Sequence, residues 1–136
     1  MMLKQQAFTT NVFNKPRWVW LLLAGLVGGA LFPYGWLADV SPTFERGLEW
    51  VFRSDAAHVV GHLFIFGLLA TAVLLLFPGL RKRPFLFYAL ILTLGLAQEA
   101  LQLISFKHHF FSSGELFDLA VDLCSATAVF LFFRKK

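Results

Sequence analysis

Residues 95–125 read GLAQEALQLISFKHHFFSSGELFDLAVDLCS, and the rest of the chain is organised around this stretch. Its first apolar run takes on Glu99 and Gln102 before a short polar turn. A second apolar run then opens with Asp118 and Asp122. Residues three or four apart share one face of a helix, so each run presents a polar face within an otherwise apolar segment. Ionisable groups in such segments are costly and usually serve a partner or a function, so this stretch indicates where the chemistry lies.

The composition of the chain is that of a membrane protein. Of its 136 residues, 58% are hydrophobic and 15% are charged, and the mean hydropathy is +0.69. Soluble domains are closer to about half apolar and about a quarter charged. The net charge of +4 comes from basic residues that flank apolar runs, which is a membrane-orienting pattern, so no nucleic-acid partner is expected. The single cysteine, Cys124, excludes an intrachain disulfide.

Four apolar segments are long enough to cross a bilayer, which requires about 20 residues. The sequence predicts an all-α fold, a four-transmembrane-helix antiparallel bundle, with the bilayer itself as its surroundings. A cytoplasmic tail over residues 1–17 precedes a single membrane domain over residues 18–136. The expected spans are residues 18–37, 56–77, 84–106 and 116–133.

The first expected span has aromatic residues at both ends, as interfacial belts require. Gly25 and Gly29 are four residues apart and form a flat seam for close helix packing, through which the chain could form an oligomer. Pro33 is expected to bend or end this helix near its exit. A cleaved signal peptide is the alternative, but apolar character continues to Leu37 and favours a retained anchor.

Residues 39–55 form the expected first outer loop. Ser41 as a cap and Pro42 at the first position are typical of a helix start. Apolar residues then fall on one face with charged residues elsewhere, which favours a short helix lying in the membrane interface. A plain extension of the next span is the alternative.

The distribution of Lys and Arg predicts how the chain is oriented. Nine of the twelve lie in the N-terminal tail, the second loop and the C-terminal tail. The other three, Arg46, Arg53 and Lys107, lie on the opposite side. Because cytoplasmic segments carry the excess of basic residues, both termini are expected in the cytoplasm of a bacterium, with the protein in its inner membrane.

Polar residues of three spans fall at matching depths below the outer boundary of the bilayer. The rise of an α-helix places a shallow level roughly 3–6 Å deep and a second level roughly 9–10 Å deep. Short connections make these spans antiparallel neighbours, so the two levels are expected to form one polar cluster. The shallow level holds His58, Gln102 and Asp118, and the deep level holds His62, Glu99 and Asp122.

Three interpretations of this cluster remain open. Its residues serve as interhelical glue, with about 0.6–2 kcal/mol for each hydrogen bond, or they line an outer-leaflet pocket that binds a lipid headgroup or a lipid-linked precursor. The third is a metal-dependent hydrolase, since His58 and His62 have the helical spacing of zinc ligands. However, Val59 stands where the zinc-protease signature requires a Glu. No metal or cofactor is therefore predicted, and a non-enzymatic role is favoured. His108 and His109 in the outer loop are expected to be solvated, where they could sense pH.

The order and spacing of these motifs resemble the VanZ-like family of small bacterial membrane proteins, named for a component of a glycopeptide (teicoplanin) resistance cluster. The resemblance covers about residues 55–130 and implies a cell-envelope role without a defined mechanism. The matching pairs are His62 with Phe66, Glu99 with Gln102, and Asp118 with Asp122.

The chain departs from the family pattern at several positions. Asp122 stands where the family has Asn, and Ser125 stands where it has Gly. His58 occupies the place of an Asp. The Arg expected before the last helix has no clear equivalent, with Lys107 or the neighbouring histidines as substitutes. The changes add negative charge at the deep level and remove a fixed positive charge.

Overall fold

The computed structural model describes residues 16–105 and 113–135, and the regular elements in that part of the chain are all helical. The expected all-α class is confirmed over these residues. The elements are α2 (Arg17–Ala30), α3 (Tyr34–Val40), α4 (Pro42–Val51), α5 (Asp55–Leu76), the 3-10 helix η1 (Pro78–Lys82), α6 (Pro84–Ser105) and α7 (Ser113–Arg134).

Three of these helices, α5, α6 and α7, are long and apolar enough to cross a membrane. Each overlaps one of the segments expected to span, over residues 56–77, 84–106 and 116–133. Helix α5 starts where it does because Ser54 caps it, with the Ser54 Oγ accepting a hydrogen bond from the Ala57 N–H at 3.2 Å. It ends at Leu76 because the ring of Pro78 disfavours a helical conformation in the residue before it.

The first apolar segment is not the single helix expected over residues 18–37. It is broken into α2 and α3, whose axes differ by 64°. Pro33 disfavours a helical conformation at Phe32, and the freed backbone finds another partner. The Tyr34 hydroxyl donates to the Gly29 carbonyl at 2.6 Å. Helix α2 has 14 residues, fewer than the roughly 20 that a bilayer requires, so only the bent pair together could count as a fourth span.

Helix α4 is a separate element in the first loop. The Ser41 Oγ accepts from the Phe44 N–H at 3.4 Å, and Pro42 occupies the first turn, as its sequence predicts. Residues 52–54 separate α4 from α5. The alternative of a plain extension of the next span is therefore wrong, and the position of α4 in the interface stays a prediction.

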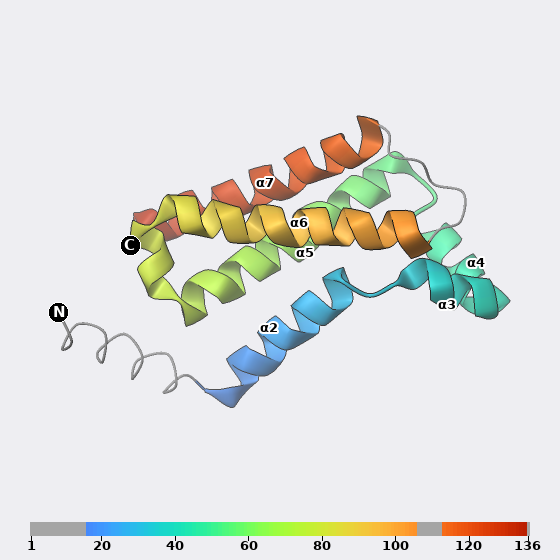
Figure 1. The fold of residues 1–136 in the computed structure, drawn as a ribbon, viewed down its shortest axis with the longest axis horizontal. Helices are drawn as coiled ribbons and strands as arrows, with labels where there is room; N and C mark the ends of the chain where they lie inside the picture. Colours follow the sequence, from blue (N-terminus) through green and yellow to red (C-terminus); the bar gives the residue numbers. More distant parts are fainter. Residues whose placement is uncertain (1–15, 106–112, 136) are drawn as a thin grey trace.

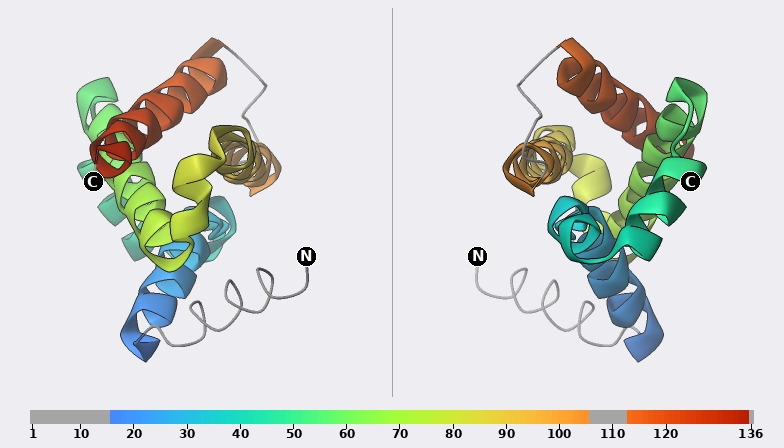
Figure 2. Two further views of the ribbon diagram at one scale, coloured as in Figure 1. Left: turned by 90° about the vertical axis from the view of Figure 1, so that its left-hand side faces the viewer. Right: turned by 90° about the vertical axis from the view of Figure 1, so that its right-hand side faces the viewer.

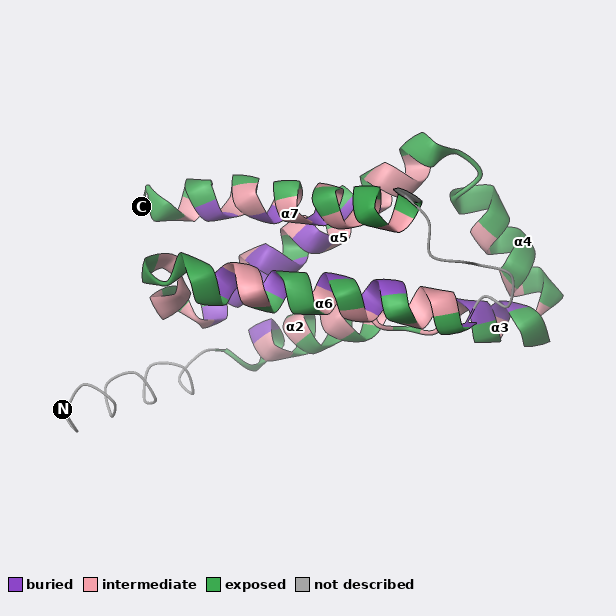
Figure 3. Cartoon of the chain, turned by 45° about the horizontal axis from the view of Figure 1, so that its top comes forward, coloured by how far each residue is buried: buried purple, intermediate pink, exposed green. Residues whose placement is uncertain are grey.

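Helix α5 is the centre of the bundle, between α7 on one side and α2 on the other, while α6 packs against α7 and α3 (Figures 1 and 2). Buried residues gather on the faces that α5, α6 and α7 turn toward one another, whereas outward faces are exposed (Figure 3). The core includes the fully buried rings of Phe66 and Phe87 and the side chain of Ile91. Large apolar side chains such as Phe64, Phe85 and Phe117 are exposed.

Two glycines allow close approach between helices at the level of the polar residues. A Cβ added at Gly95 of α6 would lie 2.7 Å from Leu119 Cδ1 and 3.4 Å from Asp122 Oδ2. A Cβ at Gly67 of α5 would lie 3.0 Å from Ser125 Oγ. Both α5 and α6 therefore approach α7 where a larger residue would push them away.

The two ends of the bundle differ in charge (Figure 1). At one end, here called the basic end, lie the start of α2, η1 and the end of α7, which carry Arg17, residues 81–83 and Arg134. At the other, the histidine end, α5 and α7 begin and α6 ends, and His58 lies in the first turns of α5. The polar levels predicted from the sequence lie toward the histidine end.

Candidate functional site

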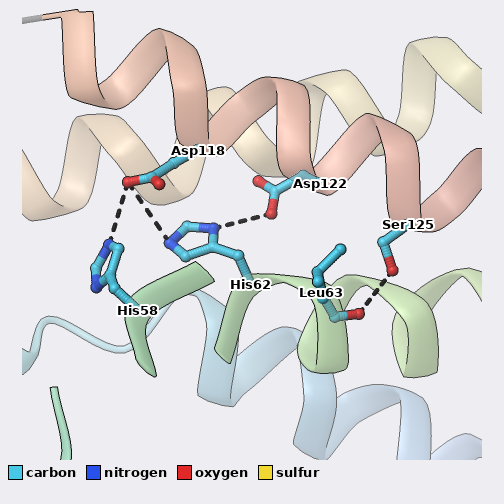
Figure 4. Close-up of polar contacts among 6 residues, drawn as sticks. All are labelled: His58, His62, Leu63, Asp118, Asp122 and Ser125. Carbon is cyan, nitrogen blue, oxygen red and sulfur yellow. Dashed lines mark hydrogen bonds and ion pairs between the residues drawn. The ribbon is translucent and has the colours of Figure 1, made fainter. Parts of the chain in front are cut away.

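Two pairs of polar residues face each other across α5 and α7. His58 and His62 lie one turn apart on α5, and Asp118 and Asp122 lie one turn apart on α7 (Figure 4). Side chains four residues apart project from one helix face, and α5 and α7 are the most closely packed helices of the bundle. The two helices therefore form two successive histidine–aspartate pairs.

The contacts within these pairs are short. His58 Nε2 lies 3.1 Å from Asp118 Oδ2, and His62 Nδ1 lies 2.8 Å from Asp122 Oδ1. The other ring nitrogen of His62, Nε2, lies 3.9 Å from Asp118 Oδ2. Because an ionised carboxylate only accepts hydrogen bonds, His62 donates from Nδ1 to Asp122. When the ring is neutral, the lone pair of Nε2 then faces Asp118.

Burial increases from the first pair to the second. The side chains of His58 and Asp118 are 38% and 14% exposed, whereas those of His62 and Asp122 are 5% and 1% exposed. The site is therefore open on the side of the histidine end and closed toward the middle of the bundle.

Helix α6 adds a third wall through Glu99. This side chain is buried, and one of its oxygens lies within 4.8 Å of ligand atoms of both His62 and Asp122. In the described part of the chain, Glu99 Oε1, Asp122 Oδ2 and Gln98 Oε1 are buried without a hydrogen-bond partner. An unpaired buried polar group costs about 1–3 kcal/mol, so these oxygens are a feature that needs an explanation.

Gln102 does not join the shallow level as expected. Within residues 16–105 and 113–135, no hydrogen bond connects its half-buried side chain to the histidines or aspartates, and its carbonyl accepts from Ser105 Oγ at 3.4 Å. The depth predicted for Gln102 came from the rise per residue alone, which takes no account of the tilt of a helix axis. Helix α6 is close to α7 at Gly95 and diverges from it toward the histidine end (Figures 1 and 2), which carries Gln102 away. The structure thus brings together the other five members of the predicted cluster.

Two supporting residues, Ser125 and Phe66, were noted in the sequence only as positions of the family pattern, without a structural role. Ser125 Oγ donates to the Leu63 carbonyl at 2.6 Å and ties α7 to α5 one turn below the aspartates (Figure 4). The ring of Phe66 is parallel to that of His62, with centroids 6.4 Å apart. A serine or a phenylalanine in an apolar run carries no distinguishing signal, although Phe66 follows His62 at a helical spacing. His108 and His109, which were expected to be solvated and could sense pH, lie outside the described residues.

The cluster combines two imidazoles with three carboxylates. The ion pairs that the described residues make with Asp118 and Asp122 all come from His58 and His62. Such a set can accept hydrogen bonds, exchange protons or hold a cation, and buried charge of this kind requires compensation. No protein-family model, curated protein or solved structure matches this chain. Function must therefore be inferred from the residues of the site.

Proposed function

We propose that the chain is a VanZ-like protein of the bacterial cytoplasmic membrane that binds a lipid headgroup or a lipid-linked precursor near the outer surface. The observation that carries this proposal is the buried convergence of His62, Glu99 and Asp122 from three helices, with two carboxylate oxygens left without a partner. A cell-envelope role, such as glycopeptide resistance through access to precursors, is supported by the motif spacing that resembles the family.

Four crossings of the membrane are part of the proposal. Helices α5, α6 and α7 are long and apolar enough to cross, and their exposed apolar side chains require a nonpolar covering. The bent pair of α2 and α3 is the fourth crossing. Its break at Pro33 is tolerable in a membrane because neighbouring groups satisfy the freed backbone, as Tyr34 does for Gly29.

The charge of the two ends supports an orientation with both termini in the cytoplasm. Basic side chains gather at the basic end, where η1 connects α5 to α6 and α7 ends. Since cytoplasmic segments are enriched in Lys and Arg, the histidine end faces outward. The binding site is then accessible from the outer leaflet, where lipid-linked precursors of the wall are presented.

This orientation is testable with reporter fusions. A green fluorescent protein fused to the C-terminus is expected to fluoresce, while alkaline phosphatase at the same point is expected to be inactive, because this enzyme folds only outside the cytoplasm. The paired reporters control for expression, since one must be active wherever the terminus lies. An active phosphatase with a dark fluorescent protein would place the histidine end inside and remove the outer-leaflet site.

The unpartnered oxygens favour ligand binding over a purely structural role. Residues that served only as glue would satisfy one another, as His62 and Asp122 do through Nδ1 and Oδ1. Glu99 instead retains a buried oxygen without a hydrogen-bond partner, and so does Asp122. Two such acceptors favour a ligand that supplies hydrogen-bond donors, such as the amine or hydroxyl groups of a headgroup.

Lipid co-purification tests this proposal. Wild-type protein extracted in mild detergent is expected to be enriched in particular lipid species, detected by mass spectrometry. Glu99→Leu is expected to lower that enrichment by about tenfold or more, because it removes a charged acceptor worth about 1.5–3 kcal/mol. The control is Glu49→Leu on α4, where the glutamate is exposed. If Glu99→Leu keeps the wild-type lipids and the fold, the glutamate does not bind a headgroup and the structural reading prevails.

A further inference from the structure

The open side of the site has the donor geometry of a metal centre. The Nε2 atoms of His58 and His62 lie on successive turns of α5 and both approach Asp118 Oδ2, at 3.1 Å and 3.9 Å (Figure 4). One ligand atom from each of these residues lies within 4.8 Å of those of the other two. Donor atoms of a tetrahedral zinc site are about 3.3 Å apart, since the metal–ligand bonds are about 2.0–2.1 Å long. The three side chains can therefore close around an ion with small adjustments.

A second carboxylate orients the inner histidine. Metal-binding histidines usually donate their other ring N–H to a carboxylate, which fixes the tautomer and makes the ligating nitrogen more basic. Asp122 accepts from His62 Nδ1 at 2.8 Å, which directs the lone pair of Nε2 toward Asp118. The ring of Phe66 lies parallel to the imidazole, with centroids 6.4 Å apart. His62 is therefore preorganised as a metal ligand.

The charge of the cluster also favours a cation. Three carboxylates, Asp118, Asp122 and Glu99, lie around two imidazoles in a largely buried site. Helices α5 and α6 contain no lysine or arginine, and Glu99 and Asp122 each retain a buried oxygen without a hydrogen-bond partner. A divalent ion supplies the missing positive charge without requiring both imidazoles to be protonated.

Access is provided on the same side. His58 is 38% exposed and Asp118 is 14% exposed, so an ion can enter from the histidine end. Three protein ligands leave a fourth position of a tetrahedral ion for water or a ligand atom, as in zinc sites that act on or bind other molecules.

We propose that His58, His62 and Asp118 form a zinc site at the histidine end, with Asp122 orienting His62. Two nitrogens and one carboxylate oxygen suit Zn²⁺, whereas Mg²⁺ and Ca²⁺ prefer oxygen ligands throughout. This site goes beyond headgroup binding. The ion would lie among His58, His62 and Asp118, whereas the unpartnered oxygens belong to the buried side chains of Glu99 and Asp122.

Metal content of the full chain tests the proposal. Protein purified in detergent, stripped with a chelator, reloaded with Zn²⁺ and desalted is expected to hold about one zinc per chain. His58→Gln and Asp118→Asn are each expected to reduce this to below about a fifth of an equivalent, because two ligands hold the ion far less tightly. The control is the double variant His108→Gln/His109→Gln, which removes two histidines from the outer loop and is expected to retain the ion.

The outcomes are decisive in both directions. Zinc retained by His58→Gln and Asp118→Asn but lost by the loop variant would overturn the assignment, as would wild-type protein below about a tenth of an equivalent. If either ligand variant fails to fold, the thermal unfolding of wild-type protein decides. Its Tm is expected to rise with Zn²⁺ and not with Mg²⁺, since only a bound ion stabilises the folded state, and no rise with zinc overturns the proposal. Zinc content and lipid enrichment are measured separately, so the zinc site and the headgroup site can fail independently.

Discussion

His62→Ala is expected to lower the free energy of unfolding by about 3–5 kcal/mol, the largest loss for any residue of the site. Asp122 is fully buried, and its hydrogen bond from His62 Nδ1 compensates its charge at 2.8 Å. Removal of one partner from a buried pair leaves the other charged and unpaired, which accounts for this cost. The measurement is unfolding in mixed detergent micelles, followed by the loss of helical circular dichroism.

A double variant separates the contribution of this pair to stability from its contribution to ligand binding. His62→Leu/Asp122→Leu removes both partners and is expected to recover most of the lost stability, because apolar side chains of similar volume can replace a buried pair at little cost. The double variant is nevertheless expected to lack both the lipid enrichment and the bound zinc of the wild-type protein. A double variant as unstable as His62→Ala would show that the loss arises from packing rather than from the unpaired carboxylate.

The same comparison at the outer pair, His58 and Asp118, is expected to give a much smaller effect. His58 is 38% exposed, so water can solvate Asp118 when the imidazole is removed. Exposed pairs contribute about 0–1 kcal/mol. If the site served stability alone, its contacts would be concentrated in the buried pair. His58, which is partly exposed, would then add little stability. The outer pair is therefore better explained by binding than by folding.

Much of the site could be predicted from the sequence because it depends on local periodicity. Four-residue spacing places His58 above His62 and Asp118 above Asp122, and short connections make their helices antiparallel. The rise per residue then matches the two levels without any knowledge of side-chain contacts. The contacts at 3.1 Å and 2.8 Å agree with this matching.

Features that depend on the direction of a helix axis could not be predicted in this way. Gln102 has the expected depth along α6, but beyond Gly95 helix α6 diverges from α7 toward the histidine end. The bend of 64° between α2 and α3 likewise depends on how Tyr34 closes onto Gly29 after the break. Pro33 predicts that a bend occurs but not its size. Tertiary packing determines both the divergence of α6 from α7 and the angle between α2 and α3, and this packing cannot be predicted from the pattern of a single sequence.

The two proposals use different parts of one cluster. Zinc at the outer three residues would offset the carboxylate charge that otherwise makes the deeper oxygens costly to bury. The deeper oxygens, on Glu99 and Asp122, would then bind donors of the headgroup. Since the two sites share His62 and Asp122, a change to either residue should affect both ligands, whereas Glu99→Leu should affect lipid and spare zinc.

Phe66→Ala is the second change with a large expected effect, about 3–5 kcal/mol of unfolding free energy. The ring is fully buried in the core and parallel to His62, and it also lies near Gly95, where α6 approaches α7. Its removal leaves a cavity among three helices and frees the imidazole to turn, so both the transfer and the cavity terms apply.

Phe66→Leu is the control, since it retains most of the volume and should cost less. Phe64→Ala on the same helix, where the ring is exposed, should change stability little. Unfolding in mixed micelles measures the loss, and equal costs for Phe66→Ala and Phe64→Ala would contradict a core role for Phe66.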